Sequence, residues 1–277
     1  MAERAIGGKV ETAGLGILGR LFSRRWILTT LLVLAATAVM ARLGVWQLDR
    51  LEERRAFNTR VQAQLDAAPL ELSGEALKAD LFNMEYRQVR VTGQYDFRQE
   101  VALRNQVHDG QWGVNLITPL LIDGSQQAVL VDRGWIPAED YESGDWSKYD
   151  EPGPVTVVGV IRRSQDRADF GPRQDPIPAP GQAPLKAWNF VNITSLQAQI
   201  DEALLPVYVQ QAPDPARQGP PFRSQPDLDL SEGPHLGYAI QWFGFAALLL
   251  FGYPFFVRKQ ERSSGSSRGK VVKDKTS

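Results

Sequence analysis

Histidine is the side chain of this sequence with the most distinctive chemistry, and the chain has two, His108 and His235. An imidazole titrates near neutral pH and can bind a metal centre. His235 directly precedes the run Leu236–Val257, which contains no charged residue. An ionisable side chain at the boundary of such a run indicates a binding function. The alternative is a helix-start residue that happens to be histidine.

His108 belongs to a different pattern. It is followed by Asp109 and Gly110, a pair that is typical of hairpin turns. We therefore expect His108 to be an exposed turn residue.

Composition excludes several other kinds of site. The chain has no cysteine, so thiolate metal sites, thiol nucleophiles and covalently attached c-type haem are ruled out. A Ser-His-Asp hydrolase would have to use one of the two histidines as its base, and the sequence has neither an H-E-x-x-H motif nor a phosphate-binding loop. The net charge of -1 argues against a nucleic-acid partner.

Two apolar runs are long enough to cross a membrane. Residues 26–46 contain a single charge, Arg42, and residues 235–257 form the second run. Each has roughly the 20 residues that a hydrocarbon core requires. A cleaved signal peptide is the alternative for the first run, because basic residues precede it and small residues end it. Its length favours an uncleaved anchor.

Basic residues near the two runs predict the orientation. They precede the first run and follow the second, which places both ends of the chain in the cytoplasm. We expect a cytoplasmic N-terminal segment at 1–25, an extracytoplasmic, periplasm-side domain at 47–234, and a basic, disordered cytoplasmic tail at 258–277. The predicted location is the cell (inner) membrane, crossed more than once.

The outer domain has the pattern of a strand-rich α+β fold. We expect the first helix to run out of the membrane towards Ala67, and a helix at Ser195–Ala203 capped by Thr194 or Ser195. Two Pro/Gly-rich stretches, 171–184 and 213–234, are predicted loops. Alternation of β-branched and polar residues predicts strands at 86–93, 100–104, 113–122, 128–136, 155–162, 187–192 and 206–211.

Four motifs stand out in order along the chain: Leu43–Arg50, Tyr86–Tyr95, Val129–Pro137 and His235–Trp242. They resemble the motifs L-G-x-W-Q-x-x-R, Y-R-x-V-x-x-x-G-x-F, V-L-V-N-R-G-W-V-P and H-L-x-Y-A-x-x-W of the Surfeit locus protein 1 family, whose members assist the assembly of haem-copper (cytochrome c) oxidase. Two positions depart from the family: Tyr95 replaces Phe and Asp132 replaces Asn.

The resemblance implies a chaperone in respiratory chain biogenesis that is not an enzyme. It implies that the protein helps to deliver haem a to the catalytic subunit of cytochrome c oxidase or insert it there. That subunit, haem a synthase and membrane lipid are the partners it suggests. For bacterial members, the histidine at the position of His235 is the suggested ligand of the haem iron, so haem a would be a transient cofactor.

Topology then suggests which residues share a site. Two antiparallel spans place the end of the first and the start of the second at the same surface, and Gly44 allows close helix approach. We expect a shared site of Trp46, Gln47, His235, Tyr238 and Trp242, with Arg133 and Trp135 able to close over it and Arg133 suited to a haem propionate. The alternatives are interfacial aromatic residues and a strand-end turn with a buried tryptophan.

Three classes of function remain open from the sequence. The first is a membrane-anchored oxidase assembly factor with a weak haem a site. The second is a scaffold that binds only protein. The third is a membrane-tethered outer-surface hydrolase or sensor.

Overall fold

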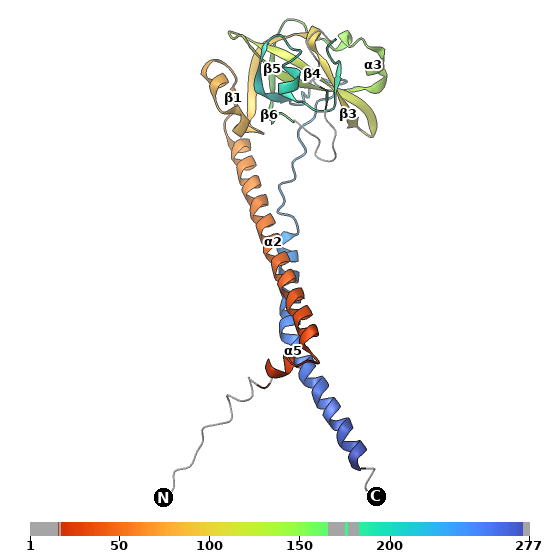
Figure 1. Cartoon of the computed structure of the whole chain (residues 1–277). Helices are drawn as coiled ribbons and strands as arrows, with labels where there is room; N and C mark the ends of the chain where they lie inside the picture. The colour runs from red at the N-terminus through yellow and green to blue at the C-terminus, as the bar shows by residue number, and fades with distance from the viewer. Residues whose placement is uncertain (1–15, 17, 166–174, 177–182, 274–277) are drawn as a thin grey trace, which may run out of the picture. The chain divides into compact units, whose positions relative to one another are not determined.

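The computed structural model describes residues 16, 18–165, 175–176 and 183–273 (Figure 1). They form two compact units. The helical unit contains the described residues up to Asn58 and those from Leu230 onwards, and the barrel unit is Thr59–Asp229. The fold is α+β, as the sequence predicts.

Two long helices dominate the helical unit, α2 (Ile27–Asp66) and α5 (His235–Lys273). Both are long and apolar enough to cross a membrane by length and composition. The helix α2 ends within a residue of its predicted end. The helix α5 continues through 258–273, where the sequence predicts a disordered tail.

The two helices pack side by side and antiparallel, as Figure 1 shows in orange and blue. The hydroxyls of Thr30 and Tyr253 lie 2.8 Å apart, whereas Gln47 lies opposite His235 at the other end of the pair. Gly44 permits the close approach, because a Cβ at this position would lie 2.8 Å from the ring of Phe243. The predicted antiparallel arrangement and the role of Gly44 are confirmed.

Beyond this contact, α2 fastens the segment that precedes α5. Arg55 donates two hydrogen bonds of 2.8 Å to the carboxylate of Glu232. Asn58 Nδ2 donates to the carbonyl oxygen of Leu230, and Arg54 Nε donates to that of Ser231. Residues 230–232 are therefore held against α2 directly before His235.

The barrel unit is built on a closed ring of five strands. Its pairing order is β2-β6-β8-β5-β4, and β4 pairs back with β2. A ring with an odd number of strands cannot be antiparallel throughout, and β5–β8 is the parallel pairing. The ring strands are β2 (Gln88–Tyr95), β4 (Gln111–Ile122), β5 (Gln127–Pro137), β6 (Pro154–Arg163) and β8 (Ala203–Gln211).

Shorter elements complete the barrel unit. The strand β3 (Val101–His108) pairs with β4, β7 (Ala187–Trp188) pairs with β3, and β1 (Leu70–Glu71) pairs with β2. The short helices are η1 (Gly74–Lys78), η2 (Leu81–Met84), η3 (Phe97–Gln99), α3 (Ala138–Ser143), η4 (Ser147–Tyr149) and α4 (Ile193–Leu196).

Every second side chain of β2 is buried and helps to fill the barrel interior. Val89, Val91 and Tyr95 point inward, and the residues between them are exposed. They pack against buried residues of the other ring strands, among them Leu120, Val129, Val131, Val157, Ile161, Val207 and Val209. Gly93 lies where β2 meets β4, and a Cβ there would come within 2.0 Å of the carbonyl oxygen of Leu121. The absent side chain lets the ring close.

All seven predicted strands are present, although β7 is shorter than expected. The predicted helix at Ser195–Ala203 is wrong: α4 is a single turn capped by Asn192, whose side chain accepts a hydrogen bond from the backbone N–H of Ser195. The chain then turns, because the amide of Gln197 bonds the carbonyls of Ile200 and Glu202. Most of the predicted loop 171–184 lies outside the described residues.

Candidate functional site

Five of the predicted site residues belong to the helical unit. Trp46 and Gln47 lie on α2, and His235, Tyr238 and Trp242 lie on α5. The direct polar contact among them joins Gln47 and His235, which are separated by 188 positions along the chain: the distance from His235 Nδ1 to Gln47 Oε1 is 2.8 Å.

This contact determines the state of the imidazole. An amide oxygen can only accept a hydrogen bond, so Nδ1 of His235 is the donor. In the neutral ring, Nε2 then carries the lone pair that binds metals. Within the described part of the chain, Nε2 has no hydrogen-bond partner. The geometry therefore presents Nε2 as an open ligand nitrogen.

Gly233, two positions before His235, brings no side chain to this nitrogen. Gly233 has a φ of +68°, a left-handed conformation that favours glycine. A Cβ on Gly233 would lie 3.5 Å from Nε2 and 3.4 Å from Cδ2 of His235. Both distances are ordinary van der Waals contacts, so it is the positive φ rather than the imidazole that favours glycine at this position.

The three aromatic residues of the predicted site differ in exposure. Trp46 and Tyr238 are exposed and Trp242 is half-buried. Ala239 is buried. Exposed aromatic rings on α2 and α5 provide apolar surface, which is also what interfacial membrane residues would provide.

Arg133, the sixth predicted site residue, lies on β5 in the barrel unit and has no exposed surface. Its Nη1 donates to Glu100 at 2.7 Å, and its Nη2 donates to the carbonyl oxygen of Tyr149 and to Glu151. The rings of Tyr95 and Phe97 lie 5.0 Å and 4.9 Å from the guanidinium carbon. A haem propionate could reach Arg133 only if this network opened.

Glu151 extends the network, because it also pairs with Arg217 and Arg223 at 2.8 Å and 3.0 Å. Burial raises the pKa of Glu100, and the Arg133 guanidinium opposes that rise. Sequence reasoning missed Glu100 and Glu151, since the partners lie 33 and 18 residues from Arg133 and no local spacing links them.

Trp135 and Gly134 match the alternative that the sequence left open, a strand-end turn with a buried tryptophan. Trp135 is buried, and its backbone exchanges hydrogen bonds of 2.9 Å and 2.8 Å with Phe222 from the 213–234 stretch. Gly134 has a φ of +116°, and a Cβ there would lie 2.7 Å from the carbonyl oxygen of Phe222. Glycine is thus required where this segment crosses β5.

His108 ends β3, and Asp109 and Gly110 form the predicted turn with φ values of 48° and 76°. The expectation of an exposed residue is wrong: His108 is half-buried, with its ring stacked on Phe222 at 4.6 Å and lying 5.3 Å from the ring of Trp135. No group of three or more His, Asp or Glu side chains that could hold a metal ion occurs in the ranges that the structure describes.

Asp132, where the family pattern has Asn, is buried on β5. Its carboxylate accepts hydrogen bonds from Asn115 Nδ2 at 2.9 and 3.1 Å and from the backbone N–H of Gly134 at 3.1 Å. Burial raises the pKa of Asp132 to about 6, against these hydrogen bonds and the charge of Arg162.

We expect the substitution Asp132→Asn to stabilise the protein above pH 6. The folded-state pKa exceeds the unfolded one, so ionisation costs folding free energy: the cost is absent below about pH 4, grows up to pH 6 and is complete above it. The variant should gain up to about 3 kcal/mol at pH 7.5 and lose this advantage at pH 4. Urea unfolding of the detergent-purified protein at both pH values measures it; a gain independent of pH would contradict this reason.

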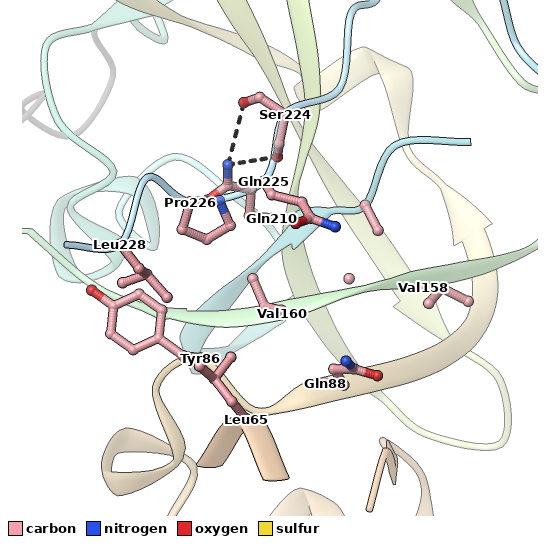
Figure 2. A pocket seen from close by; sticks show the side chains of 12 residues that line it. Leu65, Tyr86, Gln88, Val158, Val160, Gln210, Ser224, Gln225, Pro226 and Leu228 are labelled. Carbon is pink, nitrogen blue, oxygen red and sulfur yellow. Dashed lines mark hydrogen bonds between the residues drawn. The ribbon is translucent and has the colours of Figure 1, made fainter. Parts of the chain in front are cut away.

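The barrel unit also contains a cavity of about 220 Å³ (Figure 2). Leu65, Tyr86 and Leu228 lie at one end, and Val158 and Gln88 at the other. Its described lining carries no charged side chain and includes Gly159, Val160, Gln210, Ala212, Ser224, Gln225 and Pro226. Gln210 Nε2 is occupied by a 2.9 Å hydrogen bond to the carbonyl oxygen of Ser224. None of the predicted site residues lines this cavity.

Comparison with known proteins identifies a family and several relatives. Residues 34–247 match the model of the SURF1 family. The SURF1-like protein of Monosiga brevicollis is 25% identical and covers 84% of this chain and 89% of its own length. The SURF1-like protein of Rickettsia bellii is 25% identical over 90% of this chain and 99% of its own. Surfeit locus protein 1 of Xenopus tropicalis is 24% identical over 84% of this chain and 77% of its own length. The chain belongs to the SURF1 family.

Proposed function

We propose that this protein is a membrane-anchored assembly factor for haem-copper (cytochrome c) oxidase, which holds haem a transiently through His235 while the catalytic subunit matures. It is not an enzyme. The observation that carries the proposal is the Gln47–His235 hydrogen bond, which leaves Nε2 of His235 as an open ligand nitrogen. Family membership supplies the process.

The residues around His235 fit a haem. Imidazole is a common ligand of haem iron, and Nε2 of His235 would supply the electron pair that holds the iron. Gly233, two positions before His235, adds no side chain next to the imidazole. Trp46, Tyr238 and Trp242 offer ring surface for an apolar macrocycle, and α2 and α5 bring these residues into one unit.

A single neutral ligand suits a cargo that must be handed on. His235 is the only histidine of the helical unit, and the chain has no cysteine, so the described part of this unit offers no second nitrogen or thiolate ligand of these kinds. One axial bond binds haem more weakly than two, which favours release to a partner. The receiving partner is the catalytic subunit, and haem a synthase is the donor.

Membrane placement follows from the same elements. The proposed spans are parts of α2 and α5, at about 26–46 and 235–257, since both helices are long and apolar enough. The basic residues that flank the two apolar runs favour cytoplasmic termini. Residues 47–234 are on the periplasmic side. This places His235 at the outer membrane boundary, where an apolar cofactor is accessible to membrane partners and lipid.

A deletion strain tests the function. We expect loss of the gene to lower oxidase activity and the haem a absorbance of membranes, and the wild-type gene to restore both. His235→Ala should restore neither, although the protein accumulates normally. Normal oxidase in the deletion strain would overturn the assembly role. Full rescue by His235→Ala would show a scaffold that binds only protein and overturn the haem role.

A further inference from the structure

We propose that Gln47 is the positioning residue of this site: its amide oxygen fixes the tautomer and orientation of the His235 ring, so that Nε2 is the nitrogen offered to metal. The metal part of this inference rests on the proposed function. The hold on the ring rests on the 2.8 Å contact itself.

The argument begins with the tautomers of histidine. A neutral imidazole carries its proton on either nitrogen, and the hydrogen bond made by one nitrogen decides which state prevails. At the apolar boundary of the two helices, a hydrogen bond is stronger than in water, and so is the penalty for losing it. Gln47 therefore favours one tautomer and one rotamer of His235 before any ligand arrives.

The same contact links this preference to helix pairing. Gln47 comes from α2 and His235 from α5, and close packing at Gly44 and Phe243 keeps the two helices together. Metal-binding histidines nearly always donate their second N–H to an oxygen acceptor, usually a carboxylate, a backbone carbonyl or water, and losing that partner weakens metal affinity about 10- to 100-fold. Gln47 has the geometry of that partner.

The amide also sets how strongly the ring can bind. A carboxylate in the same place would draw the Nδ1 proton more strongly and raise the basicity of Nε2. A neutral amide gives a smaller increase. Haem release should therefore be fastest in Gln47→Leu, slower in the wild type and slowest in Gln47→Glu.

Gln241→Leu is the matched control. Gln241 lies on the same helix as His235, six positions further on, is exposed and has no hydrogen bond in the described part of the chain. The substitution makes the same chemical change as Gln47→Leu without removing the acceptor of His235.

Two measurements on the detergent-purified full chain test the inference. The first is ¹⁵N NMR of labelled histidines in haem-free protein, at a pH where both rings are neutral, with His108→Ala for assignment. We expect one His235 tautomer, protonated at Nδ1, in the wild type and Gln241→Leu, and a mixture of tautomers in Gln47→Leu. The second is titration with haemin, where Gln47→Leu should bind about 10- to 100-fold more weakly and Gln241→Leu unchanged.

Each possible result either supports or overturns the inference. A wild-type His235 in mixed tautomers, or one unaffected by Gln47→Leu, would overturn the hold on the ring. Equal haemin affinity in Gln47→Leu and the wild type would overturn the positioning role. If the expected tautomers are found but no variant binds haem, the haem function fails while the hold of Gln47 on His235 stands.

Discussion

Replacing Arg133 by methionine is expected to lower the free energy of unfolding by about 3–5 kcal/mol. The guanidinium is fully enclosed, and its removal leaves Glu100 as a buried carboxylate without its 2.7 Å partner. It also leaves the carbonyl oxygen of Tyr149 without its donor. Urea unfolding of the detergent-purified protein, followed by tryptophan fluorescence, to which the buried Trp135 and Trp188 of the barrel unit contribute, measures the loss.

Two variants separate this effect from a simple loss of charge. Arg90→Met removes an exposed ion pair with Glu71 from the same unit and should cost no more than about 1 kcal/mol. Adding Glu100→Leu to Arg133→Met should recover part of the stability, because no buried charge is then left unpaired. Equal losses in Arg133→Met and Arg90→Met would show that Arg133 contributes no more than a surface pair.

Much of the fold could be predicted because it depends on local patterns. The alternation along β2 and the Asp109-Gly110 turn identify a strand and a hairpin directly. The two apolar runs identify α2 and α5, and Gly44 indicates their close approach. These features act within a few residues or through composition, which a single sequence displays.

Closure of the barrel could not be predicted in the same way. The β2–β4 pairing joins residues nearly 30 positions apart, such as Gly93 and Ile122. The order of β6, β8 and β5 in the ring likewise depends on non-local pairing. The helix at α4 was placed wrongly because capping by Asn192 and the turn at Gln197 override the periodicity.

In the candidate site, too, one feature could be predicted from the sequence and another could not. The contact between Gln47 and His235 was predictable, since antiparallel spans bring their ends together. The enclosure of Arg133 was not, because a strand-end arginine is usually exposed and its partners Glu100 and Glu151 come from other segments. Burial on both faces of β5 places this charge inside the barrel unit.

The second large effect is expected at His235, the central residue of the proposed function. His235→Ala removes the only imidazole of the helical unit, and the chain has no cysteine to replace it. Because His235 is only half-buried, its loss should leave the pairing of α2 and α5 intact through the contacts of Gly44 and Thr30. Bound haem should therefore fall to background without unfolding, which far-ultraviolet circular dichroism checks.

The absorption spectrum of the detergent-purified protein, made in cells that synthesise haem a, tests this claim most directly. The wild type and His108→Ala, which removes the chain's other histidine, should show the haem spectrum, and His235→Ala should not. A haem spectrum that persists unchanged in His235→Ala, or is absent from well-folded wild type, would contradict the account.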